Sequence, residues 1–111
     1  SAWPPAADAW DMLVNTTPVG TAPDGARAPI VLAGPLAGRL VYDLVYNPPD
    51  TALLSRARAL GAETIGGLPM LVAQAVAQFH WWTGTLPDAD RMHEAALARL
   101  APPPAFPTDT V

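Results

Sequence analysis

Neither cysteine nor lysine occurs among the 111 residues of this chain, and its six basic residues are all arginines. Without cysteine, the chain can form no disulfide, no thiolate metal site and no thiol nucleophile. Without lysine, it can supply no Schiff base, no lysine general base and no phosphate-binding lysine of the Walker type. The lack of cysteine also fits a reducing compartment, and we expect a cytoplasmic location.

Clusters of positive charge and long apolar runs are missing as well. The net charge is -4 and the arginines are scattered from Arg27 to Arg99, which argues against nucleic acid as a partner. No apolar run approaches the roughly 18 residues of a membrane span, so a membrane partner is not expected either. The first residues lack the basic and hydrophobic regions of a signal peptide and look like a segment that starts within a longer protein.

The chain does contain enough apolar sequence for a buried core, because 50% of its residues are hydrophobic and only 14% are charged. Strands are predicted at residues 12–14, 40–46 and 62–65. Helices are predicted from a cap at Asp50 or Thr51 to Gly61, over residues 68–83, and from a cap at Asp88 to about Leu100. Residues 21–38 are rich in proline and glycine and are expected to form a loop.

This alternation of strands and helices predicts an α/β fold with a parallel sheet. Polar or glycine-containing turns follow each strand, at residues 15–20, 46–48 and 66–67. In an open parallel sheet these carboxyl ends lie on one edge, where ligands bind. We therefore expect a ligand site at this edge. A G-x-G-x-x-G loop, which would cradle a pyrophosphate, is absent from the chain.

Gln74 is the most informative polar residue, since it stands near the start of a helix that is otherwise almost entirely apolar. Burying its amide without a partner would cost about 1–3 kcal/mol, so either a backbone carbonyl or a ligand should meet it. On a helical wheel Gln74 falls with Met70 and Trp81. The helix begins at the predicted ligand edge, which favours contact with a ligand. The preceding Gly66-Gly67 pair is read either as a tight turn with positive φ or as a place where a ring or backbone approaches closely.

Other polar and aromatic residues have two readings each. Tyr46 ends the second predicted strand, which favours a hydroxyl displayed at the edge over ordinary packing. Asn15, Thr16 and Thr17 either satisfy the turn locally or line the site. The remaining candidates are assigned structural roles: the histidines to packing or solvent, the tryptophan pair to core and interface packing. They are His80, His93, Trp81 and Trp82. No spacing of histidine and carboxylate residues predicts a metal site.

Four motifs in register resemble the C-terminal part of the shikimate dehydrogenase family. They are Asn15-Thr-Thr-Pro-Val-Gly20, Tyr42-Asp-Leu-Val-Tyr-Asn-Pro48, Thr51-Ala-Leu-Leu54 and Gly66-Gly-Leu-Pro-Met-Leu-Val-Ala-Gln-Ala75. Phe79 and Trp82-Thr-Gly84 continue the pattern. The resemblance implies a partial Rossmann-like parallel sheet (its C-terminal half) with terminal helices. Residues 1–100 would form the C-terminal part of an NADP-binding domain, and residues 101–111 a proline-rich tail.

The resemblance also implies an activity and a set of site residues. The family interconverts shikimate and 3-dehydroshikimate by hydride transfer with NADP, in the biosynthesis of chorismate and aromatic amino acids. By resemblance, Gln74 would bind the hydroxyls of the substrate, with Tyr46 near the same ligand. The nicotinamide end of the cofactor would be surrounded by Leu44, Gly67 and Met70, with Thr16 and Thr17 lining the neighbouring loop.

The catalytic Lys and Asp of the family, its glycine-rich loop and its basic residues for the 2′-phosphate all precede the region matched here. The resemblance therefore places no catalytic residue in this chain and implies a missing N-terminal substrate domain. We expect the isolated chain to be inactive. A quinate-type paralogue and a non-catalytic ligand-binding or interaction module of the same fold remain alternatives, and pairing into a homodimer is possible.

Overall fold

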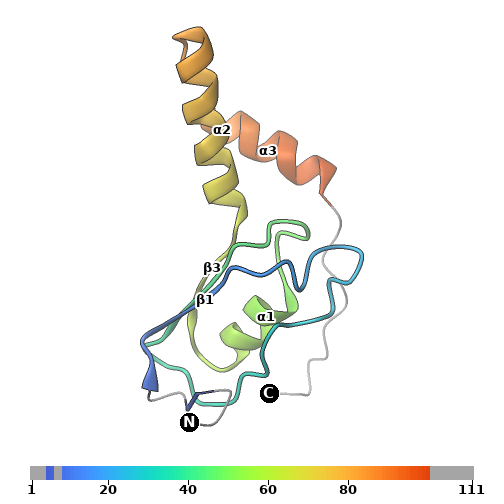
Figure 1. The fold of residues 1–111 in the computed structure, drawn as a ribbon, viewed down its shortest axis with the longest axis vertical. Coiled ribbons are helices and arrows are strands. Elements are labelled where there is room, and N and C mark those ends of the chain that lie inside the picture. The colour runs from blue at the N-terminus through green and yellow to red at the C-terminus, as the bar shows by residue number, and fades with distance from the viewer. Residues whose placement is uncertain (1–4, 7–8, 101–111) are drawn as a thin grey trace.

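The structure, a computed structural model, describes residues 5–6 and 9–100. Its sheet has three parallel strands in the order β1 (Met12–Asn15), β2 (Leu40–Asp43) and β3 (Glu63–Ile65). The helices are α1 (Ala52–Ala59), α2 (Leu68–Thr83) and α3 (Ala89–Arg99) (Figure 1). The predicted α/β fold with a partial Rossmann-like sheet is thus confirmed. The proline-rich tail predicted at residues 101–111 lies outside the described residues.

One face of the sheet carries the hydrophobic core. Val41 and Asp43 of β2 point to this face and are fully buried. Helix α1 packs on β2 and β3 there, through an apolar side formed by Leu53, Leu54 and Ala57. The long loop between β1 and β2 was read from its composition only as a loop, yet it adds two side chains to the core, Leu32 and Leu36.

No described helix covers the opposite face of the sheet. Strand pairing places Val14, Tyr42 and Ile65 in one row across the three strands, so their side chains share a face. Val14 is 42% exposed and Ile65 is 40% exposed. Within the described residues, α1 is the only helix that packs on the sheet. Parallel sheets normally bury both faces, so this face has the character of one that is covered in a larger protein.

The ends of the helices agree with the sequence signals. Thr51 caps α1, since its hydroxyl accepts a hydrogen bond from the backbone N–H of Leu54 at 3.2 Å. Gly61, just past this helix, has a φ of 95°, which the absence of a Cβ permits. Asp88 caps α3 by accepting from the N–H groups of Asp90 and Arg91.

The second strand is shorter than predicted. Residues 40–46 were expected to be extended, but β2 ends at Asp43. Two causes act together. β1 ends at Asn15, the partner of Asp43, so no ladder continues beside residues 44–46. The side chain of Asp43 also accepts the N–H of Val45 at 3.0 Å, which turns the backbone away from the sheet.

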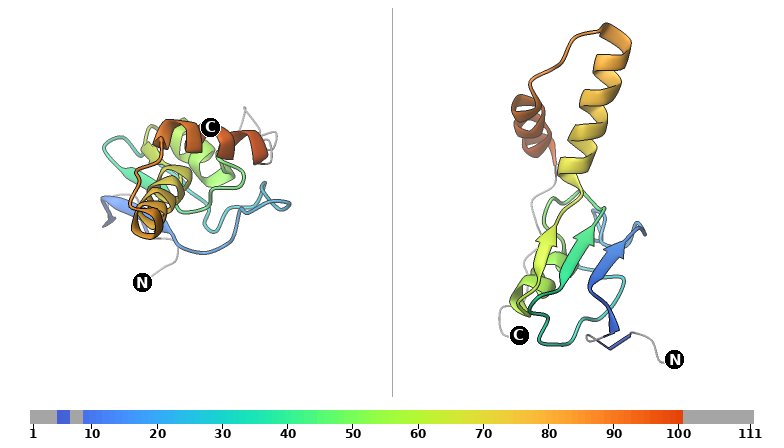
Figure 2. Two further views of the ribbon diagram at one scale, coloured as in Figure 1. Left: turned by 90° about the horizontal axis from the view of Figure 1, so that it is seen from above. Right: turned by 90° about the vertical axis from the view of Figure 1, so that its left-hand side faces the viewer.

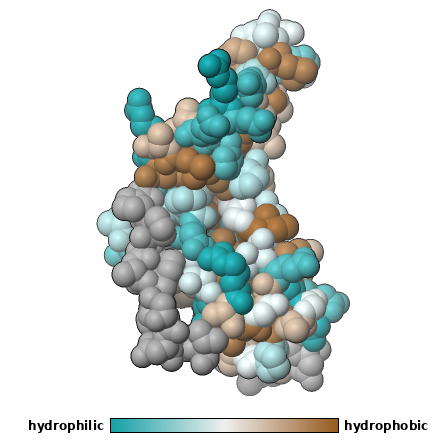
Figure 3. Space-filling view, turned by 180° about the vertical axis from the view of Figure 1, so that it is seen from behind, coloured by the Kyte–Doolittle hydropathy of each residue, from teal (hydrophilic) through white to brown (hydrophobic). Residues whose placement is uncertain are grey.

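Helix α2 rises from the strand ends and projects from the sheet, with α3 folded back beside it (Figures 1 and 2). Among the elements of the described part, α2 packs only on α3. Trp81 is 85% exposed and Trp82 is 76% exposed, so the prediction of core packing for this pair is wrong within this chain. The view from behind shows hydrophobic surface on the helical part as well as on the body that holds the sheet (Figure 3).

No helix in the described residues is both long and apolar enough to cross a membrane.

Candidate functional site

The three strands end at the same edge, as the sequence predicted. The arrowheads in the right-hand view of Figure 2 point the same way, toward the start of α2. At this edge the turn after β1 and the segment after β2 enclose a cleft of about 420 Å³. It is lined by Thr16, Thr17, Pro18, Thr21, Leu44, Val45, Tyr46 and Asn47. Four of the predicted site residues therefore meet in one cleft: Thr16, Thr17, Leu44 and Tyr46.

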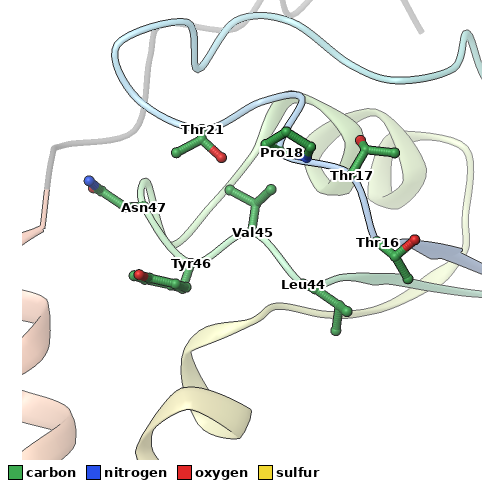
Figure 4. Close-up of a pocket in the computed structure, with 8 residues that line it drawn as sticks. All are labelled: Thr16, Thr17, Pro18, Thr21, Leu44, Val45, Tyr46 and Asn47. Carbon is green, nitrogen blue, oxygen red and sulfur yellow. The ribbon is translucent and has the colours of Figure 1, made fainter.

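The two walls of the cleft come from segments far apart in the sequence. In Figure 4, Thr16 to Thr21 run along one wall and Leu44 to Asn47 along the other, with the side chain of Val45 pointing toward the first wall. The lining contains hydroxyls, one amide and aliphatic groups, and none of its eight residues carries a charge. Such a lining suits an uncharged polar ligand that also has an apolar face.

Directly beneath the cleft lies a buried polar network of Asn15, Asp43 and Thr51. Asn15 is 4% exposed, and the other two are fully buried. One oxygen of Asp43 accepts from the Nδ2 of Asn15 at 3.0 Å, and the second accepts from the hydroxyl of Thr51 at 2.7 Å. The network joins the ends of β1 and β2 to the cap of α1.

The turn after β1 is held from within by Asn15. Its Oδ1 accepts from the backbone N–H of Thr17 at 3.0 Å and from the Thr17 hydroxyl at 2.6 Å. Its Nδ2 also donates to the carbonyl of Val19 at 3.3 Å. Asn15 and Thr17 therefore do satisfy the turn locally, and Thr17 lines the cleft as well. Thr16, the first residue after β1, is exposed.

Sequence reasoning missed the role of Asp43. It read residues 40–46 as a strand and gave the one carboxylate inside that apolar run no function. A signal was present, because an Asp in an otherwise apolar and aromatic strand must either face solvent or find several donors. The positions of its donors, at Asn15 and Thr51, could not be read from a single sequence.

Gly67 is required by the chain's own backbone. Its φ is -82°, and neither Gly66 nor Gly67 is among the glycines with positive φ, so that reading is wrong. A Cβ at Gly67 would collide with the carbonyl of Leu44 and come within 2.9 Å of the carbonyl oxygen of Val45. The N–H of Gly67 donates to that Val45 oxygen at 3.3 Å. The reading of close backbone approach is therefore the one that the structure supports, and it ties the start of α2 to one wall of the cleft.

Gln74 is exposed on the projecting helix, so the alternative of a core amide bonded to a backbone carbonyl is wrong for this chain, and the ligand contact stays a prediction. The reason is that α2 leaves the sheet and packs only on α3 in the described part. Gln74 and the half-buried Met70 are not among the residues that line the cleft. Met70 and Gln74 lie further along α2, which starts next to the cleft and extends away from it.

The described residues contain no group of three or more His, Asp or Glu side chains that could hold a metal ion. His80 is exposed near the end of α2, and His93 is half-buried on α3.

Comparison with known proteins shows a specific similarity. The family model described as shikimate 5'-dehydrogenase C-terminal domain matches residues 67–97. The shikimate dehydrogenase (NADP(+)) of Citrifermentans bemidjiense is 48% identical over 94 residues, which cover 85% of this chain and 32% of that protein. The chain therefore spans about a third of the length of the curated relatives it matches.

Two solved structures are equally similar to this chain. A shikimate 5-dehydrogenase from Thermus thermophilus, in complex with NADP(H) and shikimate, is 40% identical with a TM-score of 0.70, over 81% of this chain and 34% of that one. A quinate dehydrogenase from Corynebacterium glutamicum, in complex with NAD, is 40% identical with a TM-score of 0.70, over 79% of this chain and 31% of that one. The resemblance predicted from the four motifs, to the C-terminal part of shikimate dehydrogenases, is confirmed.

Proposed function

We propose that this chain is the C-terminal part of an NADP-dependent shikimate dehydrogenase, which interconverts shikimate and 3-dehydroshikimate by hydride transfer. The observation that carries the proposal is the cleft at the strand ends. It gathers Thr16, Thr17, Leu44 and Tyr46 at the position where α/β sheets bind ligands. The similarity to relatives of that name supports the same assignment.

The lining of the cleft fits one end of NADP and not the other. Neutral hydroxyls and aliphatic groups suit the carboxamide and the flat face of the nicotinamide ring. Phosphates would need a glycine-rich loop or basic side chains, and none lines this cleft. We therefore assign Leu44 to the nicotinamide end, and Thr16 and Thr17 to the adjoining loop. Gly67 and Met70 are assigned to the nicotinamide end by the family resemblance. When bound, the cofactor supplies or accepts the hydride.

The part of this chain in catalysis is to hold and orient ligands. Gln74 and Tyr46 are assigned to the hydroxyls of the substrate, since both are exposed and carry hydrogen-bonding groups. In the family that this chain resembles, a catalytic Lys and Asp precede the matched region, and this chain has no lysine, so the resemblance assigns the proton transfer to those residues. We assign residues 1–100 to the C-terminal part of the NADP-binding domain.

A hybrid enzyme tests this function. In it, this chain replaces the C-terminal third of the Citrifermentans bemidjiense protein, to which it is 48% identical. The hybrid should reduce NADP with shikimate as donor, whereas the isolated chain should not. Circular dichroism and thermal unfolding establish that both proteins are folded. A folded hybrid that binds NADP but has no activity with shikimate contradicts the proposal, and so does activity of the isolated chain.

Gln74→Ala in the hybrid tests the substrate contact. Removing the amide should raise the KM for shikimate by about ten-fold or more and leave the KM for NADP nearly unchanged, since one hydrogen bond to substrate is lost. Gln78→Ala is the matched control, because it removes the same side chain from an exposed position one turn further along α2. Unchanged kinetics with shikimate in the Gln74 variant would remove Gln74 from the substrate site.

A quinate-type activity is the second candidate, because this chain is as similar to the quinate dehydrogenase as to the shikimate enzyme. Comparing kcat/KM of the hybrid for shikimate and quinate, each with NADP and with NAD, distinguishes the two. A higher kcat/KM for quinate with NAD would replace the first assignment. If neither substrate nor cofactor binds, the chain is better described as a non-catalytic module of the same fold.

Two further proposals concern the whole protein. The absence of cysteine supports a cytoplasmic location, which cell fractionation tests. The exposed tryptophans at the end of α2 support a homodimer, which light scattering of the hybrid tests.

A further inference from the structure

We propose that Asp43 is the positioning residue of the cleft. It sets the distance between the two walls by bonding directly to Val45 in one wall and to Asn15, which holds the other wall, although it does not line the cleft itself. This inference rests on the proposed function only for the identity of the ligand. The residues that it joins are adjacent to those assigned to the cofactor and the substrate.

The carboxylate of Asp43 is an acceptor shared by three elements. Its Oδ1 accepts from Asn15 Nδ2 at 3.0 Å and from the backbone N–H of Val45 at 3.0 Å. Its Oδ2 accepts from the hydroxyl of Thr51 at 2.7 Å. Because Asp43 is fully buried, water cannot replace any of these donors. The carboxylate thereby fixes the end of β1, the segment after β2 and the start of α1 relative to one another.

The first wall of the cleft is positioned through Asn15. Its Nδ2 can bond to Asp43 only when its Oδ1 faces the turn, where it accepts from the N–H and the hydroxyl of Thr17. Asp43 therefore selects the orientation of the Asn15 amide, and this orientation holds Thr17 in place. A flipped amide would set its NH2 group against the N–H of Thr17 and its oxygen against the carboxylate.

The second wall is positioned through the backbone. The bond from Val45 N–H to Asp43 bends the chain just after β2, so that residues 44–47 leave the sheet and form the wall. The N–H of Leu44 donates to the carbonyl of Asn15 at 3.1 Å, which adds a direct link between the walls. Both walls thus depend on contacts that converge on one buried side chain.

A carboxylate suits this place better than an amide does. All three partners donate to Asp43, and the two oxygens of its side chain accept all three hydrogen bonds. In an Asp43→Asn variant, the side-chain oxygen can keep Asn15 and Val45, but its NH2 group would have to donate to the hydroxyl of Thr51, whose own hydrogen would then lose its acceptor. That variant has nearly the same size, so it tests the hydrogen bonding without creating a cavity.

The test uses the hybrid enzyme and measures the Kd for NADP by fluorescence together with the KM for shikimate. Asp43→Leu should raise both constants by about ten-fold or more, and Asp43→Asn by a smaller factor. Asp50→Asn is the matched carboxylate control, because Asp50 pairs with Arg58 at 2.6 Å on the surface. Leu36→Val is the stability control, because Leu36 is fully buried but does not line the cleft.

The two roles of Asp43 are separated by the control variants. If the role of Asp43 were purely structural, its variants would lower Tm as Leu36→Val does. At temperatures well below Tm, they would leave the Kd for NADP unchanged. That result for both Asp43 variants would overturn the inference. If Asp43→Leu does not fold, Asp43→Asn decides alone.

Failure of the proposed function would look different. In that case the unmodified hybrid itself would not bind NADP, and amide exchange at Thr17 and Val45 would test the positioning. Faster exchange at both sites in Asp43→Asn than in Asp50→Asn would support it, and equal exchange would overturn it.

Discussion

At the scale of single residues, the site depends on a few polar groups and one glycine that have specific partners. The fold brings Thr16, Thr17, Leu44 and Tyr46 to one cleft. Sequence reasoning placed Thr16, Thr17 and Tyr46 at strand ends, whereas Leu44 was implied only by the family resemblance. It missed Asp43, whose importance comes from partners 28 and 8 residues away in the chain. It also treated Gln74 as an amide that a backbone carbonyl or a ligand must meet, because an apolar helix is normally a buried one, whereas α2 leaves Gln74 exposed in this chain.

Gly67→Ala should destabilise the protein by about 1–3 kcal/mol, since the new methyl group would overlap the backbone that forms one wall of the cleft. Gly66→Ala is the matched control. Its Cβ would lie 3.3 Å from the carbonyl oxygen of Pro49, so a smaller loss is expected. Urea denaturation of the hybrid measures both. Equal losses would show that the contact with Leu44 does not restrict residue 67.

At the scale of elements, boundaries were predictable wherever a local signal marks them. Thr51, Asp88 and Gly84 begin or end helices as predicted, because capping depends on neighbouring backbone groups. The end of β2 was not predictable, because it depends on where β1 and β3 stop pairing. The burial of α2 also depends on distant contacts, which a helical wheel cannot supply.

Thr51→Val should lower the free energy of unfolding by about 2–4 kcal/mol. It removes the cap of α1 and leaves an oxygen of the buried Asp43 without its donor. Thr51→Ser keeps the hydroxyl and should lose much less. Asp88→Ala removes only the exposed cap of α3, so its cost should stay near about 1 kcal/mol. Thermal unfolding of the three variants gives the order of their losses in unfolding free energy. A loss for Thr51→Val no larger than that for Asp88→Ala would contradict the prediction.

At the scale of the whole molecule, the chain has the form of a part rather than of a closed globule. One face of the sheet is open, the outer edge of β1 is unpaired within the described residues, and α2 projects beyond the body. These features agree with a chain that spans about a third of its relatives. Sequence reasoning anticipated a half-sheet, but the uncovered row of Val14, Tyr42 and Ile65 became visible only with the register.

The isolated chain should bind a hydrophobic dye such as ANS and self-associate, because exposed apolar sheet faces and unpaired strand edges promote association. Val14→Ser with Ile65→Thr should reduce both effects, since these positions are 42% and 40% exposed on the open face. Thr21→Ser, at an exposed position in the cleft lining, serves as the control. Dye fluorescence and light scattering are the measurements. A monomeric chain without dye binding would show that the open face is tolerated in water.

The shared hydrogen bonds of Asn15, Asp43 and Thr51 have a consequence for evolution. Each of the three side chains is matched in donors and acceptors to the others, so a change at one position leaves a buried group unsatisfied. A lineage can therefore leave this arrangement only through paired or triple replacements. In an alignment of homologues the three positions should co-vary. The exposed Asp50 and Arg58 should vary independently of these three positions.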